Sequence, residues 1–146
     1  MKLLNLVLVI IIVLLISFVF IVNFLPKNPQ AEINGHAFAL YLAKTSQERE
    51  IGLAKYKSLA KDQGMLFLFE KPDYYSFWMK NMHFPIDIIF VRDEKIVDIF
   101  QNVPDSPNDN LPVYTTRTKA DKVLEVNAGL AKKYGIKIGS IVKLKL

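Results

Sequence analysis

Polar side chains that could take part in chemistry stand close together in one strongly apolar, aromatic-rich stretch, residues 64–90. A charged or amide group buried among apolar residues must find a partner, so such groups are expected to meet each other or a ligand. Two charged residues outside the stretch, one at the start of a predicted helix and one in a predicted strand, could complete the group. The candidate binding residues are Arg49, Trp78, Lys80, Asn81, Asp87 and Glu125.

Strand alternation leaves two roles open for Asp87, whose carboxylate falls on an otherwise apolar strand face. In a structural role, Asp87 pairs with Lys80 or Arg49, or accepts backbone amides near the Phe84-Pro85 turn, and fixes the register of the fold. In a functional role, Lys80, Asn81 and Asp87 form one cluster that faces a ligand. The sequence supports both interpretations.

Glu125 raises the same question, because it stands in a predicted strand beside apolar neighbours. Arg49 has the reach to pair with Glu125 or with Asp87. Alternatively, two carboxylates near Lys80 could shift each other's pKa enough for general acid or base catalysis. An enzyme would then use Asp87 or Glu125 as its acid or base and Lys80 as an electrostatic stabiliser.

Aromatic residues of the same stretch allow a further interpretation. They could form a stacking platform for sugar rings, with Lys80 and Asn81 supplying directional hydrogen bonds. They could equally be core residues. The residues concerned are Tyr74, Tyr75, Phe77 and Trp78.

Several classes of site lack their minimum parts in this chain. There is no cysteine, and the two histidines, His36 and His83, are far apart, so neither a zinc site nor a disulfide is predicted. Glycine-rich phosphate loops and serine nucleophile motifs are also missing. We therefore predict no catalytic residue, metal or cofactor. The net charge of +5 comes from scattered lysines without a recognition motif, so no nucleic-acid partner is expected.

The N-terminal residues predict a membrane anchor. Residues 3–25 carry no charge and, at about 1.5 Å per residue, would span about 35 Å as a helix, enough for a hydrocarbon core of about 30 Å. A signal peptide is the alternative, but its apolar region is typically shorter, and residues 26–30 offer no cleavage site of small residues. Lys2 favours a cytoplasmic N-terminus. We expect an anchor at 1–25, a linker at 26–30 and an extracytoplasmic domain at 31–146.

The domain reads as many short strands with two brief helices. An Asn-Gly turn at residues 34–35 opens a hairpin, and residues 45–48 form a capping box at a helix start. A second helix is predicted at 128–134 and an irregular loop at about 102–120. This pattern predicts an α+β domain built on a small, mostly antiparallel β-barrel or sandwich. The predicted strands are 38–42, 65–69, 76–80, 86–91, 96–100, 122–126 and 140–144.

Several motifs resemble one known family, the domain of unknown function 192 family. They include the Phe-Trp-Met-Lys-Asn block at 77–81, the Pro-x-Asp at 85–87 and the Gly-Met-Leu-Phe run at 64–67. The resemblance covers nearly all of the domain and implies a small prokaryotic β-rich fold, often exported or membrane-anchored, with no established activity. The chain departs from the family pattern where members carry Met, Arg and Thr. Those positions hold Ala54, Tyr56 and Met82.

These observations favour a binding protein of the cell envelope. We expect a single-pass membrane protein whose extracytoplasmic domain binds a wall or surface polymer or another protein. The first alternative is an enzyme acting on an envelope substrate through Asp87 or Glu125. The second is an accessory protein of a membrane complex, in which the N-terminal helix is the interacting element.

Overall fold

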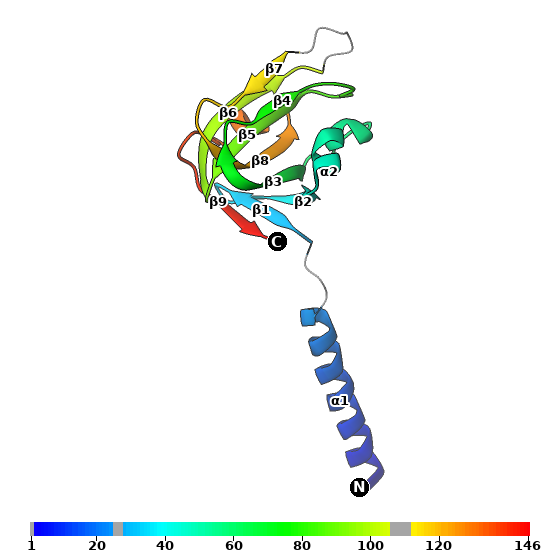
Figure 1. Ribbon diagram of the computed structural model, residues 1–146. Coiled ribbons are helices and arrows are strands. Elements are labelled where there is room, and N and C mark those ends of the chain that lie inside the picture. The colour runs from blue at the N-terminus through cyan, green and yellow to red at the C-terminus, as the bar shows by residue number, and fades with distance from the viewer. Residues whose placement is uncertain (1, 25–27, 106–111) are drawn as a thin grey trace.

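The computed structural model describes residues 2–24, 28–105 and 112–146, and it separates a helix from a β-rich domain. Helix α1 (Lys2–Phe24) lies apart from that domain in Figure 1. The side chains described in α1 are those of Val7, Leu8 and residues 10–19. Of the helices within the described residues, none has the length and apolar content needed to span a membrane.

Within the described residues, the domain contains one seven-stranded sheet and one two-stranded sheet. The strand order of the larger sheet is β6-β5-β8-β3-β2-β1-β9. All neighbours in it run antiparallel except β2 and β3. Its strands are β1 (Gln30–Ile33), β2 (His36–Ala43), β3 (Gln63–Asp73), β5 (Ile86–Arg92), β6 (Lys95–Val103), β8 (Ala120–Asn127) and β9 (Val142–Lys145).

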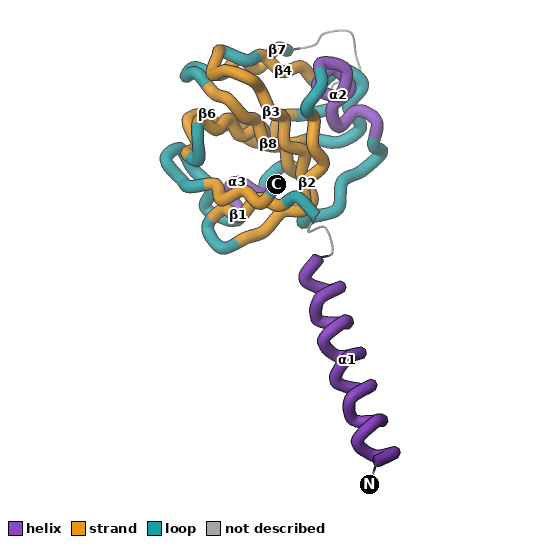
Figure 2. The backbone as a smooth tube through the Cα atoms, turned by 60° about the horizontal axis from the view of Figure 1, so that its bottom comes forward, coloured by secondary structure: helices purple, strands orange, loops and turns teal. Residues whose placement is uncertain are grey.

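The larger sheet curls until its two edges meet, as the tube in Figure 2 shows. The start of β6 bridges the residue before β9 through Lys95 and Ile141. The amide of Ile96 donates to Ser140 O at 3.0 Å, and the amide of Val142 donates to Glu94 O at 2.8 Å. The predicted mostly antiparallel barrel-like α+β domain is therefore confirmed in outline.

The curled sheet buries both of its faces. One face contributes apolar residues from all seven strands to a cluster that also contains Leu130 and Ala131 of α3 (Leu130–Lys133). On the other face, a second cluster is centred on β3, β5 and β8. It is covered by η1 (Gly52–Lys55), which contributes Leu53, and by the chain around β4 (Ser76–Trp78), which pairs with β7 (Val113–Thr115). The second face carries the candidate site.

Local sequence signals determine most element ends. Asn34 and Gly35 have φ of 50° and 80°, as the predicted hairpin requires. Thr45 and Glu48 form the predicted capping box of α2 (Ser46–Ile51), where two backbone amide hydrogen bonds lower the pKa of Glu48. Helix α2 ends at Ile51 because Gly52, with φ 52° and ψ −142°, redirects the chain into η1.

Other boundaries differ from the sequence prediction. Strand β3 runs to Asp73, beyond its predicted end at residue 69, whereas β4 ends at Trp78 because the next residues turn at Asn81, with φ 58°. The predicted loop at 102–120 contains β7, and its residues 106–111 lie outside the described part of the chain.

Candidate functional site

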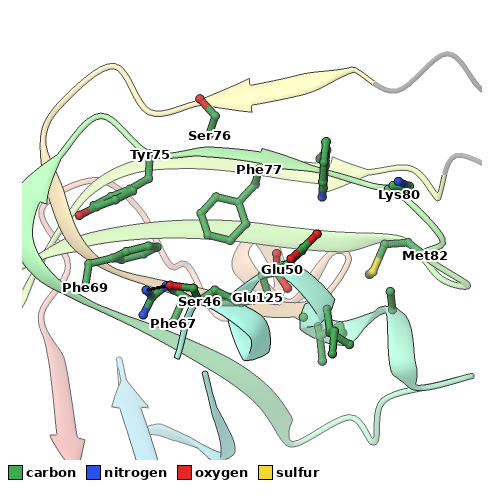
Figure 3. Close-up of a pocket in the computed structure, with 16 residues that line it drawn as sticks. Ser46, Glu50, Phe67, Phe69, Tyr75, Ser76, Phe77, Lys80, Met82 and Glu125 are labelled. Carbon is green, nitrogen blue, oxygen red and sulfur yellow. Dashed lines mark hydrogen bonds between the residues drawn. The ribbon is translucent and has the colours of Figure 1, made fainter. Parts of the chain in front are cut away.

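A pocket of about 290 Å³ lies between α2 with η1 on one side and β3 with β4 on the other (Figure 3). A second cavity of about 320 Å³ adjoins it and shares Glu50, Trp78 and Lys80 with it. The first pocket combines aromatic rings with a few charged side chains, as small-molecule sites commonly do. Its lining residues include Ser46, Arg49, Glu50, Phe67, Phe69, Tyr75, Phe77, Trp78, Lys80, Met82 and Glu125.

Glu125 is the buried charged group of this pocket. It lies on β8, the central strand of the covered face, directly between Met65 of β3 and Ile88 of β5. Its side chain is only 5% exposed, and among the described residues no hydrogen bond or ion pair reaches its carboxyl group. Burial among apolar neighbours disfavours the charged form and raises the pKa of Glu125 to about 8.

Gly64 fixes the strand that faces Glu125. A Cβ atom at Gly64 would lie 2.9 Å from the backbone oxygen of Glu125 and 3.1 Å from side-chain atoms of Leu124 and Val126. Only a residue without a side chain permits β3 to approach β8 so closely. The backbone of the Glu125 segment is therefore tightly held.

Arg49 lines the pocket but does not pair with a carboxylate, so the prediction that it pairs with Glu125 or Asp87 is wrong. Its guanidinium donates to the backbone oxygen of Leu68 at 3.0 Å, to that of Lys44 at 2.5 Å and to Ser46 Oγ at 3.3 Å. It also lies 5.1 Å from the centre of the Phe69 ring. The capped helix α2 places Arg49 against the backbone of β3, and these acceptors take three of its five N–H donors.

Trp78, Lys80 and Asn81 lie at the exposed edge of the pocket. The Trp78 ring is 49% exposed and has Lys80 Nζ 5.4 Å from its centre. Asn81 lines the adjoining cavity from a turn whose left-handed backbone suits asparagine. All three residues are exposed, and Trp78 and Lys80 line both cavities.

Asp87 does not belong to this site, which corrects the predicted Lys80, Asn81 and Asp87 cluster. It is fully buried and shares its strand face with Ile89 and Val91, whereas Ile88, beside Glu125, points to the opposite face of the sheet. Its carboxylate accepts backbone amides of Asn102 at 2.8 Å, Gly129 at 3.1 Å and Ala131 at 2.8 Å. Asp87 thus caps α3 and joins it to β6, through amides other than those expected near the adjacent turn.

The aromatic run is divided between the pocket and the outer surface. Tyr75 stacks on Phe69 at 3.6 Å between ring centres, and Phe77 meets Phe67 edge to face at 5.0 Å. The Tyr75 hydroxyl donates to the backbone oxygen of Lys71 at 2.7 Å, and burial, followed by the nearby Asp73 charge, raises its pKa. Tyr74 is exposed and does not line the pocket. The rings on the pocket therefore form a packed wall.

An ion pair between the buried Asp98 and the largely exposed Arg117 fixes the segment next to that wall. Burial alone would raise the pKa of Asp98, but hydrogen bonds from the Arg117 side chain and backbone outweigh it and lower the pKa. Next to Arg117, the amide of Thr116 donates to Tyr75 O at 3.1 Å. The segment that follows β7 is thereby fixed both to β6 and to the start of β4.

The sequence analysis did not identify Glu50, Phe67, Phe69 or Met82 as site residues. One signal was available, because Ser46, Arg49 and Glu50 follow the three- and four-residue spacing that places side chains on one helix face. For metal binding, the described residues contain no group of three or more histidine, cysteine, aspartate or glutamate side chains able to hold an ion.

The domain thus defines a class of α+β protein. In this class a curled, mostly antiparallel sheet carries an aromatic pocket that contains one buried carboxyl group. The family model DUF192, described as Uncharacterized ACR, matches residues 29–144, and the chain belongs to this family. No curated protein matches the chain.

Two solved structures are similar to the chain. A protein of unknown function from Novosphingobium aromaticivorans DSM 12444 is 36% identical, with a TM-score of 0.72 over 78% of this chain and 83% of that one. A protein from Sinorhizobium meliloti 1021, described as a candidate transcription regulator, is 30% identical, with a TM-score of 0.72 over 82% of this chain and 96% of that one.

Proposed function

We propose that this protein is a membrane-anchored, extracytoplasmic domain that binds a small ligand, or the exposed end of a wall polymer or protein, in the pocket around Glu125. The observation that supports binding is the Glu125 carboxyl group, which is buried in an aromatic pocket without a partner among the described residues. An unpaired buried carboxyl group destabilises a fold, so a ligand that pairs with it gains affinity there.

The pocket favours binding over a purely structural accessory role. Its charged and aromatic residues come from α2, β3, β8, and β4 with the residues beside it, segments far apart in the sequence. At the exposed edge, Trp78 offers a ring face and Lys80 offers hydrogen-bond donors. Such a combination recognises a ligand by shape and by a few directed polar contacts.

The proposed location is supported by the sequence. Residues 3–25 are uncharged and predominantly apolar, and Lys2 precedes them. Protease added to intact cells, with any outer membrane permeabilised, should digest the domain while the N-terminal residues remain attached to the membrane. Protection of the domain would contradict the extracytoplasmic location. A mature N-terminus near Ala31 would contradict the anchor.

Binding is testable with the one tryptophan of the chain, since Trp78 lines the pocket. The full chain in detergent micelles is titrated with solubilised wall-polymer fragments while Trp78 fluorescence is recorded. A saturable change that is lost in Glu125→Gln and retained in Glu94→Gln, an exposed glutamate in a turn, would support the pocket. Saturation that is unaffected by Glu125→Gln would place binding elsewhere.

The raised pKa of Glu125, about 8, favours one second candidate function. A carboxyl group that titrates near neutral pH is suited to act as a general acid or base, so the domain could be an enzyme on an envelope substrate. Incubation of wall-polymer fragments with the protein, followed by mass spectrometry, tests this. New products with wild type and none with Glu125→Gln would identify an enzyme.

A further inference from the structure

We infer that the pocket binds a primary ammonium group carried on an aliphatic stem, with the Glu125 carboxylate as its principal acceptor. This inference deepens the proposed binding function and depends on it. It specifies the charge and the hydrogen-bonding capacity of the ligand, which the proposed function leaves open.

The first step concerns the hydrogen-bond donors that the neighbouring strands lack around Glu125. Its in-register neighbours, Met65 and Ile88, offer no hydrogen-bond donor, and the tight approach at Gly64 holds the backbone close on the β3 side. A donor for this carboxyl group must therefore come from the pocket. Figure 3 shows the Glu125 side chain directed into that space.

The second step concerns the cations on the pocket, Arg49 and Lys80. Arg49 is bonded to the Leu68 and Lys44 carbonyl oxygens and to a serine hydroxyl. Lys80 Nζ lies over the Trp78 ring at the exposed edge. Within the described residues neither forms an ion pair with Glu125. The protein thus places no cation of its own on the buried carboxyl group.

The third step concerns the charge that the pocket selects. Its titratable side chains are Arg49, Glu50, Tyr75, Lys80 and Glu125. Glu50 is a second carboxylate on the pocket, and aromatic faces attract cations. Arg49 is already hydrogen-bonded to two carbonyl oxygens and to Ser46 Oγ, and the anionic acceptors on the pocket are the buried Glu125 and the exposed Glu50. A cation therefore fits the interior better than an anion.

The kind of cation follows from hydrogen-bonding capacity. A primary ammonium group has three N–H donors pointing in different directions, so it can reach Glu125 and a second acceptor such as Glu50. A quaternary ammonium has no donor, and a guanidinium presents its donors in one plane suited to a single carboxylate. The aliphatic stem of the ligand would pack against the aromatic wall.

The experiment uses the full chain in detergent micelles and the fluorescence of Trp78. The probes share one butyl stem: n-butylammonium, n-butyltrimethylammonium, 1-butanol and pentanoate. Nα-acetyl-lysine amide is added to distinguish a peptide-borne ammonium from a free amine. We expect saturable binding of n-butylammonium or of the lysine derivative, and affinities about tenfold or more lower for the other probes.

Variants and pH connect binding to Glu125. Glu125→Gln should weaken ammonium binding about tenfold or more, whereas the exposed Glu94→Gln should leave it unchanged. Because an alkylammonium stays charged well above neutral pH and pairs with ionised Glu125, its dissociation constant should fall about 50-fold between about pH 6 and pH 8. The Gln variant should lose this pH dependence.

Each outcome decides a specific point. Equal or tighter binding of 1-butanol, pentanoate or n-butyltrimethylammonium would overturn the ammonium inference, and so would ammonium binding that Glu125→Gln does not change. If wall-polymer fragments perturb Trp78 through Glu125 while no ammonium probe does, the inference fails and the proposed binding function stands. If neither fragments nor probes perturb Trp78, both fail.

Discussion

Replacing Glu125 by glutamine should change how the stability of the domain depends on pH. Burial raises the pKa of Glu125 from 4.5 to about 8, so the folded protein retains a proton that the unfolded chain has already released. The stabilising contribution is therefore complete below about pH 4.5, decreases as the pH rises and is lost by about pH 8. This difference in pKa corresponds to about 5 kcal/mol of unfolding free energy.

The assay compares urea unfolding of wild type and Glu125→Gln, followed by Trp78 fluorescence and circular dichroism, at several pH values from about 4.5 to about 9. At each pH the unfolding free energy of the variant is subtracted from that of wild type, and the change of this difference with pH is the observable. The contributions of all other titrating groups cancel in the difference. We expect the wild type to lose up to about 5 kcal/mol relative to the variant across this range, with no further loss above it. The exposed control Glu94→Gln should follow the wild type.

A pH-independent difference between wild type and Glu125→Gln would refute the reasoning. It would mean that Glu125 ionises in the folded protein as it does in the unfolded chain. Water would then solvate the carboxylate, or a cation such as Lys80 would pair with it. The argument for a ligand donor would fail along with the stability argument.

Three other predictions concern the parts of the fold around the site. Asp87→Asn should lower the unfolding free energy by about 2 to 5 kcal/mol in urea titrations, because three backbone amides lose a charged, buried acceptor, and should leave ligand binding intact. A double-mutant cycle of Lys80→Met with Asp87→Asn should be additive within about 0.5 kcal/mol, and coupling above about 1 kcal/mol would restore the rejected cluster. A fragment of residues 28–146 should fold alone, as measured by circular dichroism. Removal of Pro29 and Gln30 as well should lower the stability of the fragment, because Pro29 O accepts a hydrogen bond from the Leu40 amide and Gln30 pairs with β2 and β9.

The sequence predicted what local chemistry determines. The Asn-Gly hairpin, the capping box at Thr45 and Glu48, and most strands lie where turn and capping residues place them. The parallel pairing of β2 with β3 and the meeting of β6 with β9 were not predicted. These contacts depend on residues far apart in the chain, and no local pattern encodes them.

The candidate site illustrates the same limit at the level of single residues. Strand alternation correctly placed Asp87 on a face with apolar neighbours. Alternation within one strand does not, however, show which residues of the neighbouring strand lie on that same face. Asp87 and Glu125 lie on neighbouring strands and on opposite faces, because Asp87 is in register with Val126 and Ile88 with Glu125. The pocket therefore contains Glu125 and excludes Asp87, a distinction that requires the pairing register.

The surroundings of Glu125 explain why the carboxyl group that destabilises the fold is also positioned to bind a ligand. Met65 and Ile88 lie on either side of it in the sheet, and any side chain at Gly64 would collide with its backbone oxygen. The backbone cannot easily shift to carry the carboxyl group into solvent, so the unpaired group stays in the pocket whether or not a ligand is present. A ligand then meets a carboxyl group that is already positioned, and little of the interaction energy is lost to ordering the protein. Gly64→Ala should consequently weaken ligand binding even though Gly64 does not line the pocket, by displacing β3 from β8.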